Sequence, residues 1–377
     1  MTEPTINDAS GAPFRIASDK PGVSVVMTAF NDLRFIDEAV DSILQQDFPD
    51  LEVIIVDDGT GEEATFARLV ARDPRIRVLV NPTNLGPAKA ANRGIEAARA
   101  DIIARLDSDD IAERSRIGKL VAALDADPEI GLVGSWFTTI DEAGNTKETF
   151  RIPETDLEIR WALLFYTPFC HSSVAYRRDC YEAAGRYPPI PLLSSDYYLL
   201  TGMMVHCRAR NLPESLVCYR LNPRGLTATA PDAANWRART DPIREPMWAR
   251  LGVPYALRDP ALAFDLHQFV SGFAIAHIEG RHAAYCTILQ LLPPFLAAAK
   301  PFAREEDAAA ARRLAHTMVA RILSDARQDT RALLALCRLT WPLDWRATSA
   351  ALSHRLRSVL VQCLRAQKGR LRRLWPM

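Results

Sequence analysis

Short apolar runs rich in β-branched residues alternate with segments of helical periodicity in the first part of the chain. The runs predict buried strands over residues 23–29, 51–56, 75–80 and 102–106. Apolar positions at helical spacing predict helices over residues 33–46, 65–72, 87–100 and 114–127. Strands separated by helices of this length are typical of βαβ units, so the pattern predicts an α/β fold with a parallel sheet.

The pattern changes after residue 129. It predicts a strand at 130–138, a turn at 141–145 leading into an antiparallel strand, a helix at 155–165, a strand at 171–176, a helix at 195–209 and a strand at 214–219. Beyond Pro231, alanine, leucine and arginine recur at helical spacing. We therefore expect a flexible N-terminus over residues 1–21, an α/β domain over 22–235 and an α-helical C-terminal region over 240–377.

Aspartates cluster where two predicted strands end. Asp57 and Asp58 follow the second strand, and Asp107, Asp109 and Asp110 follow the fourth. The carboxyl ends of parallel strands meet at one crevice, so both clusters are expected at one site. Each cluster alone is also explained by a turn or a helix N-cap. Together they favour a site for Mg²⁺ or Mn²⁺ and a nucleotide diphosphate, because these cations keep waters and bridge to phosphates.

Composition and missing motifs exclude several classes of protein. Lys and Arg total 46, as do Asp and Glu, so no overall field favours nucleic acid. Neither the dinucleotide fingerprint nor a P-loop occurs. Seven cysteines without a Cys-x-x-Cys pair argue against disulfides and structural zinc, and favour a reduced, cytoplasmic setting. A signal segment and an apolar run of about 20 residues are both missing, so we expect no membrane span.

Four motifs follow one another at residues 23–32, at Ile55-Val-Asp57-Asp58-Gly59-Thr60, from Asn84-Leu-Gly86 to residue 95, and at Leu106-Asp107-Ser-Asp109-Asp110. In order and spacing they resemble the motifs of the family 2 inverting glycosyltransferases of GT-A fold. The resemblance continues at residues 171–178, 195–199, 211–214 and 219–223, and covers residues 22–229. It implies a GT-A domain that uses a nucleotide-diphospho-sugar donor.

The resemblance also implies roles for individual residues. The donor nucleotide is expected to contact Ala29, Asn31, Asp57, Asp58, Asn84, Gly86, Lys89 and Asp107. Asp109 corresponds to the family's metal ligand, and Asp196 to its catalytic base, which accepts the proton of the acceptor hydroxyl. His171 is a candidate on the acceptor side, although a structural histidine in a strand is an equal alternative.

Two positions depart from the family pattern. Asn222 stands where a histidine of the family often reaches the metal or the diphosphate, so its amide oxygen is a candidate metal ligand. Ala91 replaces an arginine that often precedes Asn92. The Gln-x-x-Arg-Trp motif of the processive synthases in this family is missing, which favours addition of a single sugar.

We therefore expect transfer of one sugar with inversion, from a UDP-linked donor to a hydroxyl of a glycan or glycolipid in bacterial polysaccharide or lipopolysaccharide synthesis. One alternative is a sugar-nucleotide nucleotidyltransferase, but residues 28–32 lack the glycine-rich, basic loop of those enzymes. Another is a non-catalytic nucleotide-sugar-binding homologue. Asn222 supports that alternative, whereas Asp109 together with Asp196 opposes it.

The last residues form a basic, amphipathic pattern. Residues 349–375 contain arginine and lysine but no acid, and leucines recur at helical spacing. Such a helix suits an anionic leaflet, so we expect peripheral contact with the inner face of the cell membrane. A helix packed on the catalytic domain or a dimer contact is the alternative.

Overall fold

The chain divides into two units, Met1–Ile243 and Arg244–Met377. The computed structural model describes residues 6–7, 13–14, 20–188, 194–229, 240, 242–244, 247, 292, 295–296 and 305–325. In the second unit it describes one long helix, α12 (Glu305–Asp325). The basic tail at residues 349–375 lies outside the described residues, so the expected membrane contact stays a prediction.

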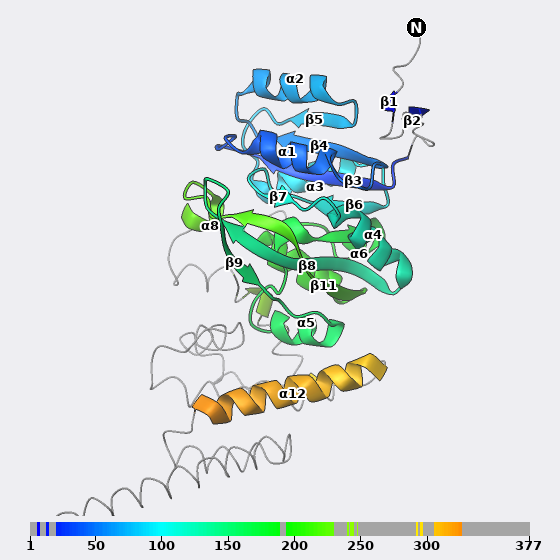
Figure 1. The fold of residues 1–377 in the computed structure, drawn as a ribbon, viewed down its shortest axis with the longest axis vertical. Helices are drawn as coiled ribbons and strands as arrows, with labels where there is room; N and C mark the ends of the chain where they lie inside the picture. Colours follow the sequence, from blue (N-terminus) through cyan, green and yellow to red (C-terminus); the bar gives the residue numbers. More distant parts are fainter. Residues whose placement is uncertain are drawn as a thin grey trace, which may run out of the picture. The chain divides into compact units, whose positions relative to one another are not determined.

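A mixed sheet forms the centre of the first unit, in the order β5-β4-β3-β6-β10-β8-β11-β7 (Figure 1). Four strands pair in parallel: β5 (Ile76–Val80), β4 (Leu51–Asp57), β3 (Val23–Ala29) and β6 (Ile102–Arg105). These are the strands that the βαβ pattern predicts. The α/β expectation is confirmed here.

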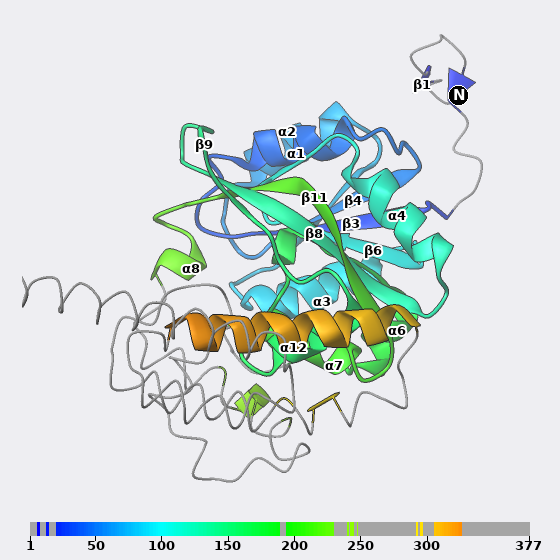
Figure 2. The same ribbon diagram turned by 60° about the horizontal axis from the view of Figure 1, so that its bottom comes forward.

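The remaining strands extend this parallel half. They are β7 (Ile111–Ala112), β8 (Ile130–Ile140), β9 (Thr146–Phe150), β10 (Ala175–Arg177) and β11 (Arg208–Arg220). The short β10 is antiparallel to both β6 and β8, whereas β8 and β11 run parallel as long neighbours (Figure 2). The turn at 141–145 leads from β8 into the antiparallel β9, as the sequence predicts. A separate pair, β1 (Ile6–Asn7) and β2 (Pro13–Phe14), lies near the N-terminus.

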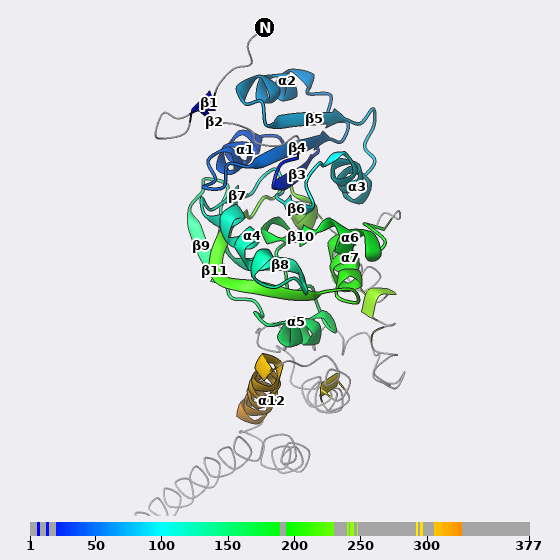
Figure 3. The same cartoon turned by 90° about the vertical axis from the view of Figure 1, so that its right-hand side faces the viewer.

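Helices cover both faces of the sheet. Figure 3 shows α1 (Ile36–Leu44) and α4 (Arg116–Ala126) on one side, and α3 (Pro87–Ala97), α6 (Arg178–Ala183) and α7 (Ser195–Met203) on the other. Within residues 20–188 and 194–229, the structure also describes α2 (Glu63–Arg72), beside β5, α5 (Asp156–Leu163), beside β11, and α8 (Leu226–Thr229).

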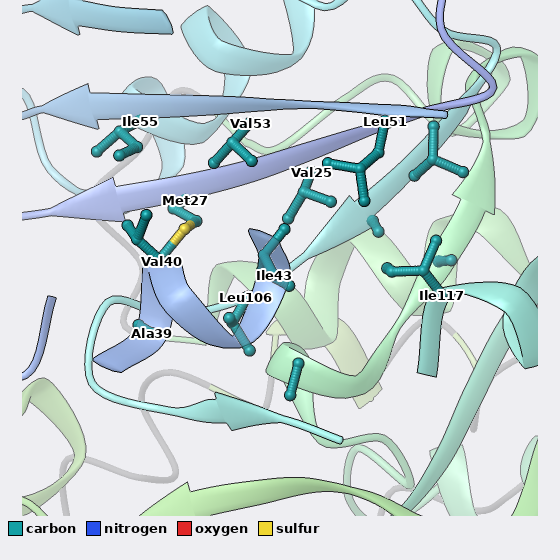
Figure 4. Close-up of a cluster of buried hydrophobic side chains, with 14 of the residues drawn as sticks. Val25, Met27, Ala39, Val40, Ile43, Leu51, Val53, Ile55, Leu106 and Ile117 are labelled. Carbon is teal, nitrogen blue, oxygen red and sulfur yellow. The ribbon is translucent and has the colours of Figure 1, made fainter. Parts of the chain in front are cut away.

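The core beneath α1 sets the position of the strands. Alternate residues of β3 and β4 meet one face of α1, as Figure 4 shows for Val25, Met27, Val53, Val40 and Ile43. Each such buried side chain contributes about 1.5–3 kcal/mol through removal of apolar surface from water. A slip by one residue would turn these side chains to the opposite face, so the core fixes where the residues after each strand lie.

Two predicted elements are wrong in part. Residues 171–176 do not form one strand, because His171–Ser173 is a 3-10 turn (η1) and β10 begins only at Ala175. The Ser173 hydroxyl donates to the Cys170 carbonyl at 2.8 Å, a local bond that competes with strand pairing. The helix predicted to reach residue 209 ends at Met203, since from Arg208 the chain pairs with β8. None of the helices in the described ranges has the length and apolar character needed to cross a membrane.

Candidate functional site

The first acidic cluster lies where β4 ends. Asp57 is the last residue of β4 and pairs in parallel register with Ala29 of β3 and Val80 of β5. The Ala29 carbonyl accepts a hydrogen bond from the Asp58 amide at 2.9 Å. The residues that follow these strands therefore share one edge of the sheet, which is where α/β proteins bind ligands.

Asp58 supports the loop that carries the Asn84-Leu85-Gly86 motif. Its carboxylate accepts hydrogen bonds from the backbone amides of Leu85 at 2.9 Å and Gly86 at 3.0 Å, and from the Asn81 side chain at 2.7 Å. Asn84 also accepts from the Gly86 amide, at 2.8 Å. These three donors, with a side chain that is 2% exposed, make Asp58 a support of the loop.

Gly59 allows the same loop to pass close by. Its φ is +81°, and a Cβ there would lie 2.6 Å from the backbone of Thr83. Any other residue would push the two motifs apart.

Asp57 differs from Asp58 because one of its two carboxylate oxygens accepts no hydrogen bond among the described residues. Oδ1 accepts from the Thr60 amide at 2.8 Å. Oδ2 is buried and has no hydrogen-bond partner in the described part of the chain. A buried carboxylate oxygen without a partner is costly, so this atom is suited to accept a hydrogen bond from a ligand.

The second acidic cluster follows β6, and Asp110 anchors it. Asp110 accepts from the Arg220 amide at 2.8 Å and from the Ser172 hydroxyl, and it is 1% exposed. Burial and the charges of Asp107 and Asp109 raise its pKa well above the ordinary value. Asp110 therefore ties the loop after β6 to the end of β11.

Asp107 forms an ion pair with His171, with 3.3 Å between the carboxylate and Nδ1. Burial alone would raise the pKa of Asp107, but His171 outweighs it and lowers this pKa to about 2. Burial alone would lower the pKa of His171, but Tyr187 and Asp107 raise it to about 10. The raised pKa favours the protonated ring of His171, and its Nε2 forms a hydrogen bond with the Tyr187 hydroxyl at 2.7 Å.

Tyr187 was not among the residues singled out from the sequence. Its backbone amide donates to the Asn92 side chain at 3.1 Å, and the Asn92 amide donates back to the Tyr187 carbonyl at 3.0 Å. The motif at Asn92 was the signal that could have found it. With both ring nitrogens of His171 bonded within the protein, the acceptor-side role of that histidine stays a prediction.

Asp109 lies half-buried between Asn222 and Arg220. Oδ2 accepts from the Asn222 amide at 2.9 Å, and the backbone carbonyl accepts from Arg220 at 2.8 Å. Burial, with the charge of Asp107, raises the pKa of Asp109. The Arg220 side chain is buried over the Phe35 ring, 4.2 Å from its centroid, so the loop is firmly held.

The remaining candidates are less closely connected. Asn31 has a φ of +66°, a left-handed conformation that asparagine tolerates. Lys89 lies exposed in the first turn of α3, and Asp196 lies half-buried in the first turn of α7. Within the described ranges, no hydrogen bond or ion pair links either side chain to the two acidic clusters. Their roles stay predictions.

The donor set fits a particular kind of cation. The described residues contain no group of three or more His, Cys, Asp or Glu side chains that could hold a metal ion. A closed structural site needs about four protein ligands. Mg²⁺ and Mn²⁺ bind through one or two carboxylates and complete their shells with waters and phosphate oxygens. Asp109, with Asp107 beside it, fits such an ion.

Comparison with known proteins identifies the family of the chain. Residues 24–185 match the family described as Glycosyl transferase family 2. The chain is 32% identical to an uncharacterized glycosyltransferase of Haemophilus influenzae over 219 residues, which are 54% of this chain and 66% of the relative. It is 30% identical to the amylovoran biosynthesis glycosyltransferase AmsE of Erwinia amylovora over 188 residues, or 49% of this chain and 70% of that relative.

Solved structures show the same fold. The crystal structure of S. aureus TarS 1–349 in complex with UDP-GlcNAc matches with a TM-score of 0.53 and 16% identity, covering 72% of this chain and 81% of that one. The chain spans 66%, 47% and 60% of three curated relatives that it matches. On the family match and these relatives, the chain belongs to glycosyl transferase family 2.

Proposed function

We propose that the protein transfers a single sugar, with inversion, from a nucleotide-diphospho-sugar to a hydroxyl of a glycan or glycolipid. The proposal rests on the observation that four aspartates of the two acidic clusters differ in their hydrogen-bond partners. Asp58 and Asp110 hold loops in place. Asp57 keeps a buried oxygen without a partner among the described residues, and Asp109 receives a side-chain donor from Asn222. Family membership supports the reaction class.

Asp57 and Asp107 bind the nucleoside. The partnerless Oδ2 of Asp57 accepts a hydrogen bond from the base or the ribose, in the loop that Asp58 holds against Gly86. Asp107, kept ionised by His171, accepts from a ribose hydroxyl. The donor is UDP-linked in this proposal.

Asp109 would hold Mn²⁺ or Mg²⁺. Such an ion offsets the negative charge that develops on the diphosphate as it leaves. The protein's part is to keep the Asp109 loop fixed through the Arg220 bond to its carbonyl. Metal ligation by Asp109 is part of the proposal.

Asp196 is the general base of the reaction. Among the described residues no hydrogen bond or ion pair engages its carboxylate, which leaves the carboxylate able to take a proton. The acceptor oxygen attacks the anomeric carbon from the face opposite the diphosphate, its proton passes to Asp196, and the bond from that carbon to the diphosphate breaks. General-base catalysis contributes about 10²–10⁴-fold in rate.

Two relatives support a polysaccharide acceptor. AmsE is named for amylovoran biosynthesis, and a relative from Rhizobium meliloti, 38% identical over 111 residues, is a succinoglycan biosynthesis protein. We propose that this protein extends a bacterial surface polysaccharide, with a lipid-linked or free glycan as acceptor.

The test uses the full chain with UDP-, GDP- and TDP-sugars, Mn²⁺ or Mg²⁺, and a panel of glycan acceptors. Release of nucleoside diphosphate, with a product of inverted anomeric configuration by NMR, is expected. Release of pyrophosphate from a sugar phosphate and a nucleoside triphosphate would identify a nucleotidyltransferase instead. Donor binding without turnover across the panel would identify a non-catalytic binding protein.

A further inference from the structure

The Asn222 amide has one permitted orientation, because each of its partners has a fixed role. Asp109 Oδ2 can only accept, so the NH₂ group of Asn222 faces it at 2.9 Å. The Arg224 amide, at 3.0 Å, and the Arg34 guanidinium, at 3.4 Å, can only donate, so both face the Asn222 oxygen. Asn222 is 7% exposed, which leaves water little access to replace these partners.

Arg34 is itself held in place. Its guanidinium donates to Asp32 at 2.6 and 2.8 Å and to Glu142 at 2.8 Å, and it lies 4.8 Å from the centroid of the Phe35 ring. Arg34 therefore connects the loop after β3 with the turn between β8 and β9, and presents a fixed donor to Asn222. The sequence separation between Arg34 and Asn222 is 188 residues.

A 180° rotation of the Asn222 side-chain amide would break its hydrogen bonds to Asp109, Arg224 and Arg34. The Asn222 oxygen would then face the Asp109 carboxylate, and its NH₂ group would face two other donors. In the observed orientation an N–H group of Asn222 engages Asp109 Oδ2, an oxygen that a cation on this carboxylate would otherwise be able to use.

We propose that Asn222, locked by Arg34 and the Arg224 amide, is a positioning residue that holds Asp109 and weakens its binding of a divalent cation. This inference rests on the proposed metal role of Asp109. Asn222 is then a competitor of the ion for Asp109, and not a ligand through its oxygen. The two roles predict opposite signs for one experiment.

The experiment measures Mn²⁺ binding to the full chain by isothermal titration calorimetry, with and without UDP. Asn222→Leu and Asn222→Ala remove the competing N–H without changing the net charge. One net hydrogen bond corresponds to about 2- to 10-fold in affinity, so we expect the Kd for Mn²⁺ to fall by about that factor. Two variants are used in case one fails to fold, and a thermal melt checks each.

A variant of Arg34 that keeps its positive charge tests whether the Arg34 contact holds the Asn222 amide in place. Lysine has one compact ammonium group and cannot reproduce the forked contacts of arginine. Arg34→Lys should therefore tighten Mn²⁺ binding to a value between those of the wild type and Asn222→Leu. The matched control is Arg68→Lys, because Arg68 makes a similar forked pair with Asp37, at 2.6 and 2.8 Å.

The matched control for Asn222 is Asn145→Leu. Asn145 also donates its side-chain amide to an aspartate, Asp141, at 3.1 Å, but in the turn between β8 and β9. It should leave the Mn²⁺ affinity unchanged. Weaker or unchanged Mn²⁺ binding in Asn222→Leu and Asn222→Ala, with binding abolished by Asp109→Ala, would overturn this inference alone. Failure of wild type, Asn222→Leu and Asn222→Ala to bind Mn²⁺, even with UDP, would overturn the metal role of Asp109 as well.

Discussion

The Asp58 carboxylate accepts a hydrogen bond from the backbone amide of Gly86 at 3.0 Å. This bond joins the Asp57-Asp58-Gly59 and Asn84-Leu85-Gly86 motifs into one structure, although they come from different strand ends. The carboxylate is buried, and asparagine in its place cannot accept the same set of N–H bonds.

Asp58→Asn should therefore lower both stability and nucleotide affinity. Loss of hydrogen bonds to a charged group costs about 1.5–3 kcal/mol, so we expect a lower midpoint of thermal unfolding and a clear rise in the Kd for UDP. Differential scanning calorimetry and titration calorimetry measure the two effects. An unchanged unfolding midpoint would show that the 84–86 loop does not depend on this residue.

Asp57→Asn should separate binding from stability. Asp57 Oδ2 has no hydrogen-bond partner in the described residues, so its replacement removes no bond from the unliganded protein. We expect nucleotide affinity to fall by about 10-fold or more, the scale of a lost charged hydrogen bond, with little change in the unfolding midpoint. Equal nucleotide affinity in variant and wild type would contradict the assignment of Asp57.

Asp196→Asn should remove chemistry and keep binding. The substitution preserves shape and removes the base, so turnover should fall by about 100-fold or more, while the Kd for the donor stays the same. Steady-state kinetics with a glycan that serves as acceptor measure the turnover, and titration calorimetry measures the Kd for the donor. Near-normal turnover in this variant would place the base at another residue.

Glu52 is expected to link stability to pH. It is 1% exposed and accepts from the Ser24 hydroxyl at 2.7 Å, from the Arg99 amide at 2.7 Å and from the Arg77 guanidinium at 2.9 Å. Burial alone would raise the pKa of Glu52, but these hydrogen bonds lower it.

A lowered pKa in the folded state stabilises the protein above the unfolded pKa of about 4.3, and this contribution is lost as pH falls through the folded value. Glu52→Gln should therefore lower the free energy of unfolding by about 2 kcal/mol at pH 7, and flatten its decrease below about pH 4.3. Urea unfolding at pH 7 and pH 3 checks this prediction. The free energy of unfolding could fall from pH 7 to pH 3 by the same amount in Glu52→Gln as in the wild type. That result would assign the pH dependence to other carboxyl groups.

Local periodicity predicts the parallel half of the sheet well. Residues 23–29 and 51–57 are buried on both faces, which produces the continuous apolar runs that identify such strands. The position of Asp57 at the end of its strand follows from that assignment. The short β10, antiparallel between β6 and β8, carries too few residues for periodicity to identify its pairing.

Contacts between distant residues are the part that the sequence does not predict. The Arg34 bond to Asn222 and the His171 bond to Tyr187 depend on where loops converge after the sheet has formed. The type and spacing of side chains along the sequence do not predict where such loops lie relative to one another. The same limit explains why the sequence does not predict the role of Tyr187.

The most direct test of the account is the dependence of nucleotide binding on Mn²⁺ in Asp109→Ala. Asp101→Ala is the control, because Asp101 is an acid with a side chain 76% exposed, paired with Lys20. Wild type and Asp101→Ala should bind UDP at least about 10-fold more tightly with Mn²⁺ than with EDTA, a difference of about 1.4 kcal/mol. Asp109→Ala should bind UDP equally in both conditions. A full Mn²⁺ effect in Asp109→Ala would contradict the proposed site.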